Sequence, residues 1–216
     1  MTALSGEQMW LFAMALGTTM WITAAGLAIA VVLALPLALL LNARQRLASI
    51  VARLYVELMR GSPLVILLFL VYYGGPSIGV TLNAITVGIA MLGFYGAAYF
   101  AEIFRAGLNA VPRGEVEAGQ VLGLSRMQIL RYIRLPQMAR TILAPATGQT
   151  INLIKESAVL SIITVAELTK IAGEISNLTF SVITPYLTAA LLYWGLVEVV
   201  SRASFAVERR LHLRSS

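Results

Sequence analysis

The segment from Glu117 to Pro136, EAGQVLGLSRMQILRYIRLP, is well suited to binding another molecule, because it is charged within an otherwise apolar chain. A hydrophobic protein has little reason to hold such a segment unless something in water docks on it. Glu117 would be a docking anion, and Ala118 and Gly119 would permit close approach of a partner. The arginines of the segment could instead bind the phosphates of anionic lipid. The residues alone leave docking and lipid binding equally open.

Local signals predict the shape of this segment. Residues Gly114 to Leu122 can form one short helix, and Gly123 is a natural residue to end it, because glycine readily adopts the left-handed conformation found there. The pair Ser125 and Gln128 has the spacing of a capping box that begins a second helix. Pro136 is expected to end or kink that helix near Leu135. We therefore predict two short helices with a sharp bend, lying across the membrane surface.

A second polar group lies within the fourth apolar run. Gln149, Asn152 and Glu156 are spaced three and four apart, so they share one helix face, with Lys155 and Ser157 beside it. A charge at mid-bilayer costs about 2.5–3.5 kcal/mol, so such residues normally face a bundle interior or a watery cavity. Lys155 or an amide could hold a carboxylate, and Glu156 an ammonium group. The face is a candidate substrate path, and a structural ion-pair network between helices is the equally weighted alternative.

The remaining residue types give no sign of catalysis. The chain has no cysteine and a single histidine, His212, which is expected to be a solvated tail residue. These counts exclude thiolate chemistry and argue against haem or iron–sulfur centres. The phosphate-binding pattern G-x-x-x-x-G-K-[ST] is also missing from the sequence. No catalytic residue, metal site or cofactor is therefore expected in this chain.

Composition identifies the elements that must position these groups. The chain is 59% hydrophobic and 12% charged over 216 residues, whereas soluble domains average about 25% charged residues. A helical membrane protein with a single domain over residues 1–216 is predicted, because several apolar runs reach the roughly 20 residues that span a bilayer. A short interfacial helix is expected before the first run. The five predicted spans are Gly17–Leu41, Leu54–Tyr73, Leu82–Phe104, Ile142–Val165 and Val182–Val200; the interfacial helix is Met9–Leu16.

The basic residues predict the orientation. Nearly all of the 16 Lys and Arg residues fall in the first loop, the third loop and the C-terminal tail. Only Lys170 lies on the opposite side, and Lys155 lies inside a span. Cytoplasmic loops carry the excess of basic residues, so the N-terminus is predicted outside and the C-terminus inside. The net charge of +6 is then a consequence of topology, and no nucleic-acid partner is expected.

Other charged residues near the spans favour local pairing. Glu102 and Arg105 are three apart and are expected to form an ion pair. Glu57 has Arg53 and Arg60 within one helical turn, which again favours a structural role. The sequence Gly-Ser-Pro that follows Arg60 predicts a bend between an interfacial helix and the second span.

The segment EAGQVLGLSRMQILRYIRLP resembles the cytoplasmic EAA loop of ABC-importer permeases: a Glu-Ala-Ala start, a Gly six residues after the Glu, and a closing Ile-x-Leu-Pro. Gly119 replaces the usual third-position Ala. Three further segments resemble the polar-amino-acid branch of that family, so the resemblance covers nearly the whole chain in order. They are Glu57–Gly74 (ELMRGSPLVILLFLVYYG), Ala98–Pro112 (AYFAEIFRAGLNAVP) and Leu153–Thr169 (LIKESAVLSIITVAELT).

The resemblance implies a type I importer-like permease with a coupling loop at about 106–140. It implies ATPase-coupling roles for Glu117, Ala118, Gly119, Gly123, Leu135 and Pro136. The expected function is the permease subunit of an ATP-driven importer for polar amino acids in a bacterial inner membrane, and not an enzyme itself. An ion-gradient-driven secondary transporter or channel subunit is the alternative.

The resemblance also implies partners. They are a second permease chain, either a copy or a paralogue, two cytoplasmic ATPases that hold ATP and Mg, and an extracytoplasmic amino-acid-binding protein. Membrane lipid surrounds the spans.

Overall fold

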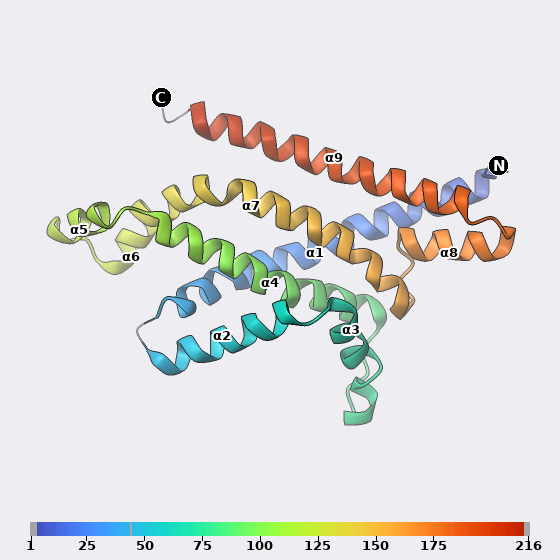
Figure 1. The fold of residues 1–216 in the computed structure, drawn as a ribbon, viewed down its shortest axis with the longest axis horizontal. Helices are drawn as coiled ribbons and strands as arrows, with labels where there is room; N and C mark the ends of the chain where they lie inside the picture. The colour runs from blue at the N-terminus through green and yellow to red at the C-terminus, as the bar shows by residue number, and fades with distance from the viewer. Residues whose placement is uncertain (1–3, 44, 214–216) are drawn as a thin grey trace.

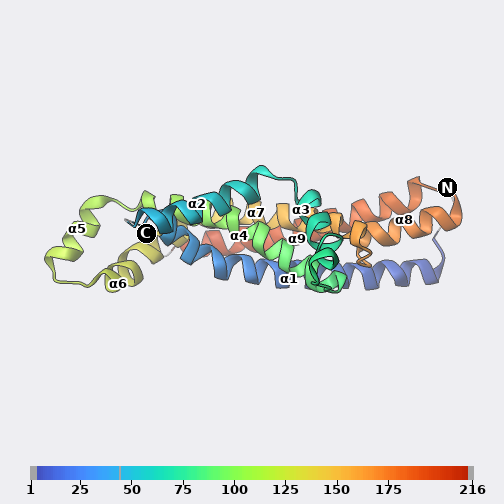
Figure 2. The same ribbon diagram turned by 90° about the horizontal axis from the view of Figure 1, so that it is seen from below.

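The computed structural model describes residues 4–43 and 45–213, with side chains to residue 209. Within that part of the chain every regular element is helical. Figures 1 and 2 show a long, flat bundle with α5 and α6 at one end and the N-terminus with α8 at the other. The elements are α1 (Gly6–Leu41), α2 (Arg46–Gly61), α3 (Leu64–Tyr72), η1 (Gly75–Ile78), α4 (Ala84–Ala110), α5 (Arg113–Val121), α6 (Arg126–Ile129), η2 (Leu130–Arg134), α7 (Leu135–Glu156), η3 (Ser157–Ile163), α8 (Leu168–Thr179) and α9 (Ile183–Leu213).

Helix α4 lies at the centre of the bundle and packs closely against α1. A Cβ atom on Gly93 would lie 2.6 Å from Cγ2 of Ile29, and one on Gly96 would lie 2.9 Å from Cβ of Ala30. Small residues let two helix backbones approach in this way, which is the usual basis of helix packing in membranes. The close packing fixes α4 relative to α1 and so positions every polar group that α4 carries.

The first helix is longer than the sequence predicted. Ser5 and Gln8 form a capping box at its start, and α1 then runs without a break to Leu41. The prediction of a separate interfacial helix at Met9–Leu16 was therefore wrong. The physical reason is tertiary: Phe12 is buried in a cluster with residues of α8 and α9, so this segment has a protein partner.

The second apolar run is broken, as the sequence predicted at Gly61-Ser62-Pro63. Helices α2 and α3 meet at an angle of 103°, and Ser62 has the extended conformation that a following proline favours. Among the described helices α1, α4 and α9 are each long and apolar enough to span a membrane, and α2–α3 together would make a fourth. Helix α7 is not apolar enough to be counted as a span by the same measure. The count of five spans therefore stays a prediction.

Pro136 was predicted to end or to kink the helix, and the first of these alternatives was wrong. Helix α6 passes through the π-helical turn η2 directly into α7, with Pro136 in the first turn of α7. The amide of Leu135 donates to the carbonyl of Leu130, five residues back, so the wider turn absorbs the change in bonding that proline imposes. The predicted second short helix is instead the start of a long one.

The predicted fourth run also differs at its far end. Helix α7 ends at Glu156, and the chain tightens into the 3-10 helix η3 as far as Ile163. Thr164 then adopts a left-handed conformation with φ of 68°, which turns the chain toward α8. The side chain of His212 lies outside the described residues.

Candidate functional site

The α5–α6 segment, residues 113–134, is a helical elbow at the end of the bundle (Figures 1 and 2). Gly123 turns the chain with φ of +76°. The predicted capping box is present: the Ser125 amide donates to Oε1 of Gln128 at 2.8 Å, and the Gln128 amide donates to Oγ of Ser125 at 3.3 Å. The predicted first short helix, the bend at Gly123 and the capping box that begins the second helix are therefore confirmed.

The outer surface of the α5–α6 segment offers both charge and apolar area. Glu117 and Ala118 are exposed on α5. At the tip Val121 is 88% exposed, Leu122 79% and Met127 70%. Large apolar side chains held in the open beside a carboxylate are typical of a docking surface.

Gly119 has a different place from the one expected for contact with a partner. It is buried, and a Cβ atom there would lie 2.7 Å from Cδ1 of Ile133 and 3.3 Å from Cγ1 of Ile129. The close approach at Gly119 is therefore between α5 and the start of the long helix of the same chain. This packing holds the two arms of the elbow together.

Arg134 joins the elbow to the bundle. Its guanidinium donates to the carbonyl of Leu108 near the end of α4 at 2.9 Å. A cavity of about 370 Å³ lies beside it and has Glu117 and Gln120 of α5 in its wall. Leu135, next in the chain, is half-buried, whereas Pro136 is exposed.

The polar residues of α7 do not all share one environment. Gln149 is buried and 8% exposed. Ser157 is also buried, and its hydroxyl donates to the carbonyl of Ile154 at 2.7 Å. Asn152, three residues after Gln149 on α7, is exposed. Gln149 and Ser157 are therefore packed inside this chain.

Lys155 and Glu156 lie in the last turn of α7, exposed and half-exposed respectively. Neither belongs to an ion pair in the part of the chain that the structure describes. The structural ion-pair network between helices is thus not formed among those residues. Their exposure leaves both charges accessible from outside this subunit.

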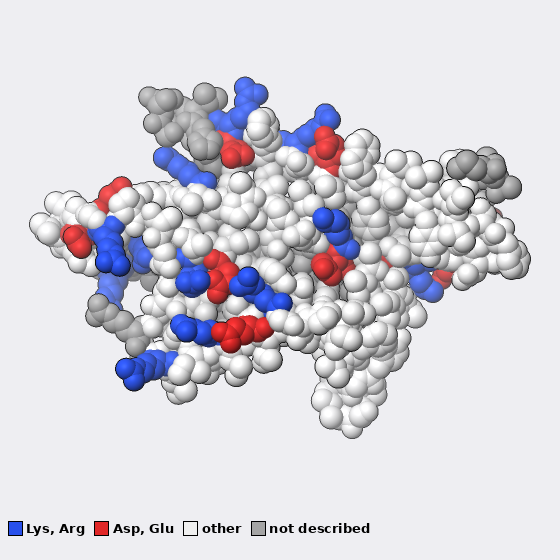
Figure 3. Space-filling model, in the orientation of Figure 1, with Lys and Arg blue, Asp and Glu red and all other residues white. Residues whose placement is uncertain are grey.

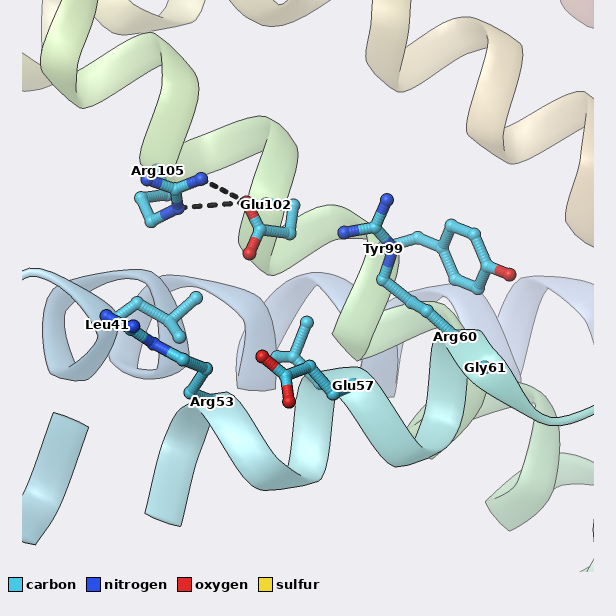
Figure 4. Close-up of a pocket in the computed structure, with 9 residues that line it drawn as sticks. Leu41, Arg53, Glu57, Arg60, Gly61, Tyr99, Glu102 and Arg105 are labelled. Carbon is cyan, nitrogen blue, oxygen red and sulfur yellow. Dashed lines mark hydrogen bonds and ion pairs between the residues drawn. The ribbon is translucent and has the colours of Figure 1, made fainter. Parts of the chain in front are cut away.

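The structure also forms a charged cavity that the sequence did not predict as a site (Figure 4). Its volume is about 640 Å³, and it lies between α2 and α4. The predicted pair of Glu102 with Arg105 is confirmed at 2.6 Å. The residues that line the cavity are Leu41, Arg53, Val56, Glu57, Arg60, Gly61, Tyr99, Glu102 and Arg105.

The predicted local pairing of Glu57 is not formed. Within the described residues neither Arg53 nor Arg60 lies within ion-pair distance of its carboxylate. The Arg60 guanidinium instead lies 5.3 Å from the centre of the Tyr99 ring on α4. This cation–π contact across two helices competes with the pairing that spacing along one helix would favour.

Sequence reasoning also missed Glu167, a buried carboxylate at the start of α8 that is 1% exposed. It accepts hydrogen bonds from the amides of Thr169 at 2.9 Å and Lys170 at 2.7 Å. The hydroxyl of Tyr193 on α9 donates to it at 2.6 Å. The signal was an acidic residue at the end of an apolar run, in a position to cap the helix that follows.

Charges gather over one part of the molecule in Figure 3, from the elbow to the middle of the bundle, while the far end is almost entirely uncharged. The described residues form no group of acidic or histidine side chains able to hold a metal ion. An exposed elbow at one end, several long apolar helices and a charged cavity between α2 and α4 are together typical of a transport subunit of a membrane.

Comparison with known proteins agrees with this class. The profile of the family described as "Binding-protein-dependent transport system inner membrane component" matches residues 26–213. The "Probable amino-acid ABC transporter permease protein YckA" of Bacillus subtilis (strain 168) is 37% identical over 159 residues, which cover 74% of this chain and 70% of the relative. The "L-cystine transport system permease protein TcyB" of the same organism is 34% identical over 181 residues, which cover 83% of this chain and 77% of the relative.

A solved structure, "Crystal structure of an amino acid ABC transporter with histidines", has a TM-score of 0.87 and 33% identity, and the match covers 97% of this chain and 100% of that one. This chain therefore belongs to the family of inner-membrane components of binding-protein-dependent transport systems. It is a multi-pass permease subunit of an ABC importer with the all-helical type I fold. Family membership favours the ATP-driven importer over the ion-gradient carrier.

Proposed function

We propose that this chain forms the translocation path of an importer for polar amino acids and is driven by ATPases that dock on its α5–α6 segment. Relatives named for amino-acid transport support the cargo class. The proposed partners are two ATPases that hold ATP and Mg, a second permease chain and an extracytoplasmic amino-acid-binding protein. In this arrangement the α5–α6 end and the C-terminus face the cytoplasm.

The observation that carries the proposal is the exposed surface of the elbow. Glu117 and the apolar tip are exposed. Gly119 packs the two arms of the elbow together, and Arg134 joins the elbow to the end of α4. A rigid knob with a charged and apolar surface can fill a groove on a partner and transmit a push. Glu117, Ala118, Gly123, Leu135 and Pro136, to which the resemblance gives coupling roles, lie on or next to this knob, and this position supports the proposal.

Affinity purification of the tagged chain from its native membrane in mild detergent tests the proposal. The wild-type chain should bring a stoichiometric ATPase with it, and Glu117→Arg should lose that ATPase. Glu174→Arg is the matched control, because it makes the same charge change on the exposed surface of α8 at the opposite end of the bundle (Figure 1). A wild-type chain that purifies without any ATPase would refute the coupling role.

A further inference from the structure

The charged cavity between α2 and α4 has an uncommon balance of groups. It holds two carboxylates and three guanidiniums, but only Glu102 and Arg105 are paired with each other. Glu57 and Arg53 have no ion-pair partner among the described residues, although they lie one helical turn apart. Oppositely charged side chains at this spacing are close enough to pair. Here they point into the cavity instead.

Figure 4 shows how these side chains lie. The carboxylates of Glu57 on α2 and Glu102 on α4 are directed toward the same space, and the Arg60 side chain extends from α2 toward α4 beside Tyr99. The cation–π contact at 5.3 Å holds Arg60 in this position. It leaves the hydrogen-bond donors at the edge of the guanidinium available, because the ring contact does not use them.

The geometry points to a binding subsite for a free α-amino acid in this cavity, with its ammonium group on Glu57 and its carboxylate on Arg60. A free carboxylate and a fixed guanidinium in one cavity match the two charges that every α-amino acid carries. The volume of about 640 Å³ lies within the roughly 300–1,000 Å³ of small-molecule sites. The inference rests on the proposed function, because it places the cargo of that function.

The polar surface beside the subsite extends toward α7. The Tyr99 ring that supports Arg60 carries a hydroxyl 3.1 Å from the hydroxyl of Tyr95, one turn earlier on α4. Tyr95 in turn lies near enough to Glu156 to interact with it electrostatically. Tyr99 and Tyr95 therefore extend the polar surface of α4 from the cavity in the direction of α7. Cargo bound at Glu57 and Arg60 would occupy a second position beside the path proposed from α7.

The same pair of charges occurs in the headgroup of phosphatidylethanolamine, so the test must separate free amino acid from lipid. The whole complex is purified and placed in nanodiscs of phosphatidylglycerol, whose headgroup carries no ammonium group. An equimolar mixture of the twenty common amino acids is then equilibrated with it, and the retained compound is identified by mass spectrometry. Phosphoethanolamine is the competing probe for the lipid reading.

Two variants test the assignment of each charge. Arg60→Gln should weaken binding of the retained amino acid roughly tenfold or more, the effect of losing one charge-assisted hydrogen bond, and should change binding of its decarboxylated amine little. Glu57→Gln should weaken the amino acid similarly and spare its deaminated acid. Glu174→Gln, on the surface of α8, should bind all probes as wild type does.

Three outcomes would overturn the inference. They are retention of no amino acid, equal weakening of all three probes in both variants, and displacement by phosphoethanolamine at a concentration similar to the amino acid. The ATPase content of the same preparation separates this failure from failure of the proposed function. A complex that keeps its ATPase but fails these tests loses only the subsite.

Discussion

Replacement of Glu167 by alanine removes one carboxylate that serves three donors at the junction of α8 and α9. Loss of a helix N-cap costs about 1 kcal/mol. The Tyr193 hydroxyl loses its 2.6 Å acceptor, and an unsatisfied buried hydroxyl costs about 1–3 kcal/mol. The lower end applies, because the Thr169 hydroxyl remains 3.4 Å away as a partner. Relief of the carboxylate's own desolvation offsets part of the sum of these two losses, so about 1–2 kcal/mol is expected.

Unfolding in mixed micelles at increasing fractions of sodium dodecyl sulfate, followed by far-ultraviolet circular dichroism, measures this change. Glu174→Ala is the matched control, since it removes a carboxylate from the same helix that makes only a surface ion pair with Lys170 at 3.0 Å. Such pairs contribute roughly 0–1 kcal/mol. The loss of stability in Tyr193→Phe should lie between those of Glu167→Ala and Glu174→Ala, because Tyr193→Phe removes one of the three hydrogen bonds to Glu167.

The double variant Glu167→Ala with Tyr193→Phe completes the test. Because both changes break the same hydrogen bond, the double variant should lose clearly less stability than the sum of the losses in the two single variants. Full additivity, or a Glu167→Ala chain as stable as Glu174→Ala, would refute the argument that this carboxylate joins α8 to α9.

Two further predictions concern packing and the elbow. Gly93→Ala should destabilise the chain by about 1–3 kcal/mol in the same unfolding assay, the usual cost of overpacking, because its Cβ would lie 2.6 Å from Cγ2 of Ile29. Gly17→Ala, with open space around it, should not, and equal stability of the two variants would contradict the packing argument. Ser125→Ala should lose the cap on the Gln128 amide, worth about 1 kcal/mol, so amide hydrogen exchange in α6 should quicken roughly fivefold. Ser125→Thr keeps the cap, so its α6 amides should exchange at the wild-type rate. A wild-type rate in Ser125→Ala as well would show that the cap does not limit opening of α6.

Sequence reasoning succeeded where the structure depends on neighbours in the chain. The elbow follows from Gly123, Ser125 and Gln128, each of which acts within one turn of itself. The bend at Ser62 follows from the proline after it. In each case the conformation is decided by the residue and its immediate sequence, so no knowledge of distant contacts is needed.

Sequence reasoning failed where a distant contact decides the outcome. Met9–Leu16 continues α1 because Phe12 finds partners in α8 and α9. Glu57 stays unpaired because Arg60 lies over Tyr99, a residue on another helix. The charged cavity requires α2 and α4 to lie side by side, so its members come from two separate stretches of sequence. The roles of the coupling residues came from the family resemblance, and the physical pattern alone left lipid binding open.

The continuity of the helix through Pro136 bears directly on coupling. Helix α6, the turn η2 and α7 form one helical path from Arg126 to Glu156, about 45 Å at the usual rise per residue. Had Pro136 ended the helix, a push on the elbow would bend a hinge near the membrane surface and be lost there. Because the path is continuous, a displacement of the elbow is carried to Lys155 and Glu156 at its far end. Under the proposed function, an ATPase that moves the elbow therefore moves the charges beside the substrate path without an intervening loop.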